Sequence, residues 1–178
     1  FMKIKCIELW HVAIPLASTF HPSWIPGFRQ NENKFNLVRF TTESGIEGYS
    51  AATAMGNERQ GLGHLLGPYF LGERADDIAG VRQRLREMSY LGWRVGWLEP
   101  ACWDIIGKAA GKPVYELLGG SPGRVKLYAS TGEIISREGQ IEEVQKRLAE
   151  GFDSVKLRVH ADTLAEDIDG IRRAREAV

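Results

Sequence analysis

The sequence predicts an α+β domain over about residues 2–120, followed by the first two β/α units of a parallel structure. Segments rich in β-branched and aromatic residues, typical of strands, come first, at residues 3–14, 36–42 and 46–50. Apolar residues then recur at helical spacing, over residues 76–90 and 97–110. After Pro122 strand and helix patterns alternate, and the two strands start roughly 30 residues apart, the length of a βαβ unit.

The composition and the start of the chain argue against several classes of protein. The 178 residues include 23 Lys+Arg and 23 Asp+Glu, a formal net charge of zero, whereas nucleic-acid-binding domains normally show a basic excess. No apolar run approaches the roughly 20 residues that span a bilayer, and residues 2–10 alternate charged and apolar groups too early for a secretory signal. Cys6 and Cys102 lack CxxC spacing, which suggests a reducing compartment. We expect a cytoplasmic globular protein that binds neither nucleic acid nor membrane.

A long loop is expected between the first two strands. The strand pattern of residues 3–14 ends at a proline, and the sequence of residues 15–34 shows neither strand nor helix periodicity. Loops of this length inside compact domains are uncommon, and they are usually functional lids or disordered segments. This one is too aromatic for a plain linker, because it contains Phe20, Trp24 and Phe28.

The remaining elements follow from local signals. Turn residues at 43–45 join the next two strands into a hairpin. The helix over residues 97–110 has Pro100 in its first turn, and Gly111 and Pro113 end it. The last four elements are two strands and two helices, expected at residues 125–130, 140–150, 154–159 and 164–178. Two β/α units cannot close a sheet or a barrel, so we expect the chain to stop in the middle of a fold.

Several segments resemble one family. Residues 37–49 (LVRFTTESGIEGY) look like the hairpin of the N-terminal capping domain of the enolase superfamily, and residues 102–120 (CWDIIGKAAGKPVYELLGG) are similar to its helix-and-stop signature. Residues 125–130 and 151–159 (GFDSVKLRV) resemble the first two strands of its barrel. The likeness is to the mandelate racemase/muconate lactonizing enzyme branch of that superfamily.

The resemblance implies a modified TIM barrel behind an α+β cap. Residues 2–120 would form the capping domain, with residues 15–34 as its lid loop, and residues 121–178 would form the first two β/α units of the barrel domain. It also implies Mg²⁺ held by three carboxylates on later barrel strands, beyond Val178, so no metal ligand is expected in this chain. A small-molecule carboxylate substrate and a homo-oligomer are further expectations.

Three polar residues near the end of the last strand are candidates for chemistry. Strand alternation places Lys156, Arg158 and His160 on one face, and such groups at a strand's C-terminal end fit an active site at a barrel mouth. Taken without the resemblance, a Lys/Arg face is often a solvated edge. His160 is assigned to substrate binding, with a place at the strand end or in a loop as the alternative.

The pattern at Lys156 and Arg158 departs from that of the family, which has the motif K-x-K. There the first Lys usually helps to neutralise the substrate carboxylate, and the second is often the base. A guanidinium stays protonated in almost any environment, so Arg158 suits a carboxylate clamp better than a general base. The base would then be Lys156 or a residue beyond Val178, such as a His on a later strand.

The lid loop corresponds to the family segment that closes over substrate and sets specificity. Trp24 and Phe28 would supply apolar walls, and His21 or Arg29 would meet a polar end of the substrate. The alternative is that the aromatic residues simply pack the loop onto the barrel or a neighbouring subunit.

The resemblance implies a Mg²⁺-dependent enzyme that enolises a carboxylate substrate. Removing a proton beside a carboxylate builds charge on an enediolate, which a divalent metal and nearby cations must stabilise. Racemases, cycloisomerases and acid-sugar dehydratases begin with that step, so the full-length form would be an isomerase or a lyase. Arg158 favours one-base outcomes such as dehydration, whereas the aromatic loop favours a less polar substrate. The alternative is a non-catalytic fragment or a pseudoenzyme that retains the cap fold.

Overall fold

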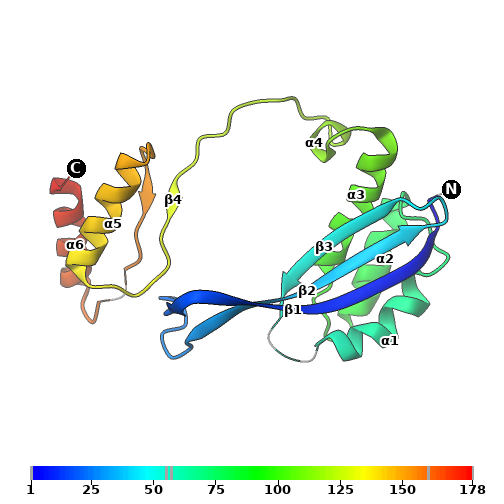
Figure 1. Cartoon of the computed structure of the whole chain (residues 1–178), viewed down its shortest axis with the longest axis horizontal. Coiled ribbons are helices and arrows are strands. Elements are labelled where there is room, and N and C mark those ends of the chain that lie inside the picture. Colours follow the sequence, from blue (N-terminus) through cyan, green and yellow to red (C-terminus); the bar gives the residue numbers. More distant parts are fainter. Residues whose placement is uncertain (1, 55, 57, 160, 178) are drawn as a thin grey trace. The chain divides into compact units, whose positions relative to one another are not determined.

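A computed structural model describes residues 2–54, 56, 58–159 and 161–177 (Figure 1). Two compact units are distinguished by their internal contacts. Unit 1 comprises Phe1–Ile14 and Asn33–Pro122, and unit 2 comprises Pro15–Glu32 and Gly123–Val178. Within the ranges described, no helix is both long enough and apolar enough to cross a membrane.

Unit 1 is built on a three-stranded sheet in the order β1-β2-β3. The strands are β1 (Ile4–Phe20), β2 (Gln30–Thr42) and β3 (Glu47–Thr53). β2 and β3 are antiparallel, with a register from Phe35↔Thr53 to Thr41↔Glu47. Gly45 has a φ of 85° in the connecting turn, a conformation that glycine adopts without steric cost. The predicted hairpin is therefore confirmed.

Helices cover one face of this sheet (Figure 1). They are α1 (Glu58–Phe70), α2 (Ile78–Ser89), the 3₁₀ turn η1 (Gly96–Leu98) and α3 (Glu99–Ala110), and the short α4 (Val114–Leu117) follows and contacts α3. The helices predicted over residues 76–90 and 97–110 are confirmed as α2 and α3, whereas α1 was not predicted. The Asp77 side chain accepts a hydrogen bond from Gly80 N and caps α2, and Gly111, with φ 63°, ends α3.

The core of unit 1 lies between the sheet and the helices. Val38 and Phe40, which are fully buried, point to the helices because alternate side chains of β2 face the same side. The helices contribute buried residues at helical spacing: Leu62, Leu66 and Phe70 from α1, Val81, Leu85 and Met88 from α2, and Ala101, Cys102 and Ile105 from α3. Gly48 allows the closest approach, since a Cβ there would lie 2.0 Å from the carbonyl oxygen of Ala101.

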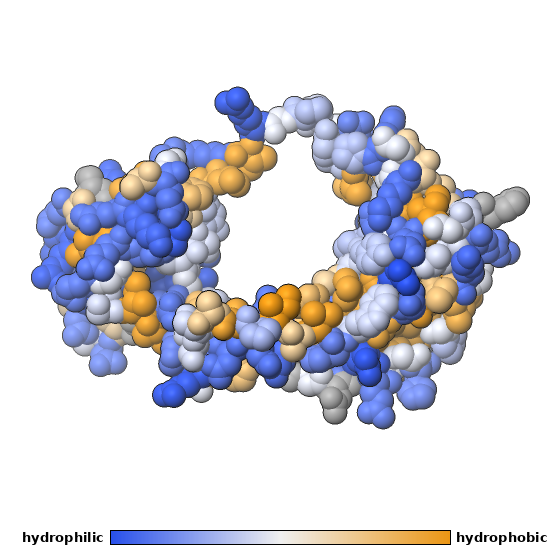
Figure 2. All heavy atoms as spheres, in the orientation of Figure 1, coloured by the Kyte–Doolittle hydropathy of each residue, from blue (hydrophilic) through white to orange (hydrophobic). Residues whose placement is uncertain are grey.

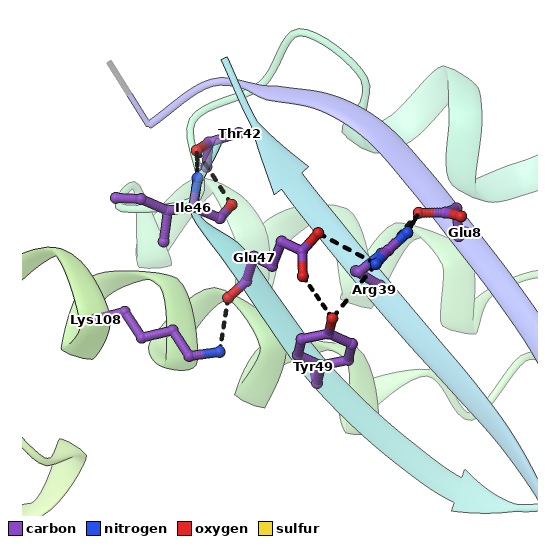
Figure 3. A network of polar contacts seen from close by, with 7 residues as sticks. All are labelled: Glu8, Arg39, Thr42, Ile46, Glu47, Tyr49 and Lys108. Atoms are coloured by element: carbon purple, nitrogen blue, oxygen red, sulfur yellow. Dashed lines mark hydrogen bonds and ion pairs between the residues drawn. The ribbon is translucent and has the colours of Figure 1, made fainter. Parts of the chain in front are cut away.

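Side chains of α3 cover the free edge of β3. Lys108 Nζ donates a hydrogen bond of 2.8 Å to the carbonyl of Glu47 (Figure 3), and Asp104 Oδ2 accepts one of 3.0 Å from the backbone N–H of Tyr49. The two α3 side chains also form an i,i+4 ion pair of 2.7 Å. Edge strands otherwise present unpaired backbone groups, so this pair has a structural role at the sheet edge.

Arg39 ties the three strands together on the sheet face opposite the helices (Figure 3). Its Nε donates to Glu8 Oε2 of β1 at 2.7 Å, and its Nη1 lies 3.1 Å from Glu47 Oε1 of β3. The hydroxyl of Tyr49 donates to the same Glu47 side chain. These contacts support the register that the backbone pairing sets.

The segment predicted as a loop over residues 15–34 is mostly strand, so that prediction was wrong. β1 continues to Phe20 and β2 begins at Gln30, which leaves only residues 21–29 as the connection. Pro15 is compatible with β1 because β1 lies at the edge of the sheet, where a missing N–H is tolerated. Cross-strand contacts such as Thr19 Oγ1 to Asn31 Oδ1, 2.7 Å, stabilise this extension without any local apolar periodicity.

In unit 2 a parallel βαβ arrangement is present, as predicted. β4 (Ala129–Ser130) pairs with β5 (Val155–Lys156) in the register Ala129↔Val155 and Ser130↔Lys156, with α5 (Arg137–Ala149) between them and α6 (Leu164–Glu176) after them. The strands are shorter than predicted. Figure 2 shows hydrophobic side chains at the surface of the segment that leads into β4, where Val125 and Leu127 are 80% and 68% exposed.

Candidate active site

Hydrogen bonds continue past the β4–β5 ladder and connect the segments that follow the two strands. The backbone N–H of Thr131 donates to the carbonyl of Lys156 at 3.2 Å, and the Thr131 hydroxyl donates to the same oxygen at 2.6 Å. Arg158 Nε in turn donates to the carbonyl of Thr131 at 3.3 Å. Gln140 of α5 donates to the carbonyl of Arg158 at 3.0 Å. Lys156 and Arg158 are therefore held beside the end of β4.

The tip of the β1–β2 hairpin is fixed to the segment after β4, within unit 2. Ile134 N donates to the carbonyl of His21 at 2.9 Å, and Ser23 N donates to the carbonyl of Gly132 at 3.0 Å. Pro22, which is buried, forms an antiparallel bridge with Glu133. Residues 21–23 thus run as a short strand along residues 132–134.

Aromatic rings of the tip lie over Gly132 and Arg158. The Arg158 guanidinium carbon is 5.1 Å from the centre of the Trp24 ring, within the range of a cation–π contact. Trp24 also packs at a tilted angle against Phe20, with 5.8 Å between ring centroids. A Cβ atom at Gly132 would lie 3.0 Å from Trp24 Cζ3 and 3.3 Å from Phe20 Cζ, so the absence of a side chain there makes room for both rings.

Lys156 has an aromatic neighbour that sequence reasoning missed. Its Nζ lies 5.6 Å from the centre of the Tyr128 ring. Ser130 is the register partner of Lys156, and Tyr128 lies two positions before Ser130. Strand alternation puts Tyr128 and Ser130 on the same face, and this is the sequence signal that could have identified Tyr128. Among the described residues neither Lys156 nor Arg158 forms an ion pair with a carboxylate, so two cations two positions apart in the chain have no carboxylate paired with them here.

The other predicted site residues are distributed as follows. His21 contributes its backbone carbonyl to the tip contact. Phe28 and Arg29 are exposed on the same connection, and Phe28 N closes a local turn onto the carbonyl of Ile25 at 3.0 Å. His160 lies outside the described residues. The structure thus brings Trp24 to Arg158 and leaves Phe28 and Arg29 facing solvent.

The described residues do not supply a metal centre. No group of three or more His, Cys, Asp or Glu side chains in the described ranges is arranged to hold a metal ion. The acidic residues at the start of α6 cap that helix: Glu166 forms a capping box with Thr163, and Asp167 Oδ1 accepts from Ala161 N at 3.0 Å. The residues present therefore do not fit a Mg²⁺ site by themselves.

Taken together, the fold is that of an α+β domain followed by the first β/α elements of a parallel structure, with two cations where the second strand ends. The comparisons with known proteins agree with this class. The family described as "Mandelate racemase / muconate lactonizing enzyme, N-terminal domain" matches residues 11–119, and the chain belongs to this family of the enolase superfamily.

Relatives of known activity are similar along the whole chain. The cis-3-hydroxy-L-proline dehydratase of Roseibium aggregatum is 28% identical over 99% of this chain and 50% of its own length. The solved structure of the N-succinyl Arg/Lys racemase from Bacillus cereus is 27% identical, with a TM-score of 0.85 over 99% of this chain and 49% of that one. The chain thus spans about half the length of the curated relatives it matches.

The fold is also shared with a more distant solved structure. The dipeptide epimerase from Enterococcus faecalis, complexed with Mg and the dipeptide L-Leu-L-Tyr, has a TM-score of 0.84 at 24% identity, and it covers 99% of this chain and 51% of its own. The family to which this chain belongs therefore includes dehydratases, racemases and epimerases.

Proposed function

We propose that the full-length protein abstracts a proton from the carbon beside a carboxylate of a small-molecule substrate, as an isomerase or a dehydratase. The observation that carries the proposal is the pair Lys156 and Arg158, two cations where β5 ends, with no carboxylate partner among the described residues; Arg158 lies against Trp24 of the hairpin tip and Lys156 against Tyr128. Membership of the family, whose relatives include dehydratases and racemases, supports the same reading.

Arg158 is proposed as the carboxylate clamp. Its guanidinium remains charged and offers a planar set of donors that matches a carboxylate. Because it cannot release a proton to become a base, a two-base racemisation that uses this position is disfavoured, and this favours dehydration or another one-base outcome.

Lys156 is proposed to stabilise the charge that forms as the proton leaves. The electron pair of the broken C–H bond moves into the carboxylate and creates an enediolate, and a nearby ammonium lowers the energy of that dianionic group. The proton goes either to Lys156, when its amine is neutral, or to a base outside the described residues. Trp24 and Phe28 would supply apolar walls of the substrate site, and His21, Arg29 and His160 would bind polar parts of the substrate.

The cofactor and the domain roles are part of the same proposal. Mg²⁺, which is present in the solved dipeptide epimerase structure, is expected to bind through residues outside those described, because the described residues offer no ligand set. Residues 2–120 are assigned to the capping domain, with residues 15–34 as its lid, and residues 121–178 to the first two β/α units of the barrel. A homo-oligomer remains a prediction.

The test follows solvent exchange of the α-proton. The full-length protein would be incubated with Mg²⁺ in D₂O with N-succinyl-L-arginine, L-Ala-L-Glu, arabinonate or cis-3-hydroxy-L-proline, and loss of the α-proton signal would be followed by NMR. We expect exchange or turnover of at least one acid, abolished in Lys156→Ala. Lys126→Ala is the matched control, since Lys126 is exposed and, among the residues that the structure describes, pairs with Asp153 alone, at 2.9 Å. Exchange in Lys156→Ala at the wild-type rate would remove Lys156 from the mechanism.

A second measurement separates an enzyme from a pseudoenzyme that keeps the fold. A metal that binds only the folded state raises the melting temperature. We expect Mg²⁺ to do so for the full-length protein. A folded protein that shows neither a shift with Mg²⁺ or Mn²⁺ nor exchange of any of the four acids would favour the non-catalytic alternative.

A further inference from the structure

The segment after β4 carries Gly132 where the hairpin tip meets Arg158. Gly132 gives its carbonyl to Ser23 N, while the rings of Trp24 and Phe20 occupy the space where its side chain would be. Its φ is not in the left-handed region, so backbone conformation does not require glycine here. What requires glycine at this position is the close approach of the two rings.

The position of Trp24 follows from a fixed anchor. The two backbone hydrogen bonds at His21 and Ser23, and the bridge at Pro22, end immediately before Trp24 in the chain. One residue beyond this anchor, the indole can reach only a small region, and Gly132 leaves that region open. The ring remains 53% exposed, and it contacts both Phe20, with 5.8 Å between ring centroids, and the Arg158 guanidinium.

Two neighbours orient the Arg158 guanidinium. Nε–H donates to the carbonyl of Thr131 at 3.3 Å, which fixes the rotation of the planar group, and the Trp24 ring lies against it 5.1 Å away. A guanidinium has five N–H donors in one plane, and the four on Nη1 and Nη2 have no hydrogen-bond partner among the described residues. A carboxylate would therefore approach in the plane, at the edge formed by these two nitrogens.

We propose that Gly132 is a positioning residue for substrate binding: its missing side chain seats Trp24 on Arg158, and this contact holds the guanidinium edge in the orientation that accepts a carboxylate. The proposal rests on the proposed function for the identity of the ligand, but the contact itself exists without substrate. It predicts that Gly132 and Trp24 affect the binding of an acid much more than the chemical step.

The test uses the full-length protein, four single variants and the double variant Gly132→Ala/Trp24→Leu. Gly132→Ala introduces a methyl against the two rings, Trp24→Leu removes the contact with Arg158, and Trp24→Phe keeps an aromatic face. Gly123→Ala is the control, because no atom of the described residues lies within 4 Å of its added Cβ and its φ is not positive. KM and kcat would be measured with whichever of the four acids is turned over. The rate of phenylglyoxal modification at Arg158 would be followed by peptide mass spectrometry without substrate.

The two readouts have defined expectations. Gly132→Ala and Trp24→Leu should each raise KM about 3- to 10-fold, as expected for loss of a partly exposed cation–π contact, with kcat within about twofold, and both should speed modification of Arg158. The double variant should show little further change, because both substitutions break the same contact. Gly123→Ala should stay near wild type, and Trp24→Phe, which keeps an aromatic face, should raise KM less than Trp24→Leu.

The outcomes separate this proposal from the proposed function. Faster modification of Arg158 in both variants, with no turnover of any acid, would support the contact and contradict the enzymatic role. Turnover with unchanged KM and unchanged modification rates in Gly132→Ala and Trp24→Leu would overturn the positioning role. A loss of kcat and folding stability with KM unchanged would also overturn it, because that result defines Gly132 as merely structural.

Discussion

Replacing Gly48 by alanine should strongly lower the free energy of unfolding of unit 1. The added Cβ would lie 2.0 Å from the Ala101 carbonyl oxygen and 2.7 Å from Ile105 Cγ1, both in the fully buried part of α3. The first contact is with backbone, which cannot turn aside as the end of a flexible side chain can. We therefore expect α3 to move away from β3.

The size of the effect follows from what this movement disrupts. Overpacking of a core costs about 1 to 3 kcal/mol. The hydrogen bonds from Lys108 to Glu47 and from Tyr49 to Asp104 join the same two elements, and their loss adds roughly 1 kcal/mol each. The sum, about 3 to 5 kcal/mol, is a large part of the ~5 to 15 kcal/mol by which domains are stable.

Urea unfolding followed by circular dichroism measures the change in the free energy of unfolding. Gly63→Ala is the matched control: Gly63 lies inside α1 with open space around its Cβ position, so alanine should stabilise the protein by about 0.5 to 1 kcal/mol. A Gly48→Ala protein within 1 kcal/mol of wild type would refute the reasoning from close approach.

Three further predictions concern unit 1. Burial raises the pKa of the Cys102 thiol to about 12, whereas Cys6 is exposed, so a thiol reagent at pH 8 should label one cysteine in the native protein and two in denaturant. Hydrogen bonds from Arg82 lower the pKa of Glu99, so its carboxylate stabilises the fold above its ordinary pKa and this contribution disappears as the pH falls through the lowered value. In Glu99→Gln, the free energy of unfolding should fall less between pH 5 and pH 3 than in wild type. Asp104→Ala should cost about 1 to 2 kcal/mol and speed hydrogen exchange of the β3 amide that it binds, and normal exchange at that amide would contradict edge protection.

Elements with strong local signals were predictable from the sequence. α2 and α3 combine apolar spacing with an N-cap at Asp77 and a stop at Gly111, and both formed close to their predicted bounds. α1 was missed because three glycines and Pro68 lie within it and lower its helical propensity. Its stability comes from the burial of Leu62 and Leu66, spaced by one turn, and that spacing was the available signal.

The candidate site was predictable only where it depends on one strand. Alternation places Lys156 and Arg158 on one face; Lys156 ends β5 and Arg158 follows two residues later, and their role stays a prediction. The attachment of the hairpin tip to residues 132–134 depends on backbone hydrogen bonds between segments more than a hundred residues apart. Such pairing produces no periodicity in either segment, so the sequence pattern did not identify Gly132 as a site residue.

The uninterrupted course of β1 and β2 has a consequence for exchanging hairpin tips between relatives. Both strands run without a break to the tip, so strand alternation sets which side of the hairpin each residue of its two arms occupies. Because successive side chains alternate, adding or removing one residue between Ile14 and Phe20 would turn Phe20 to the opposite side, whereas a change of two would preserve its direction. Grafted tips should therefore be compatible only when the arms differ by an even number of residues, whatever the composition of the tip itself.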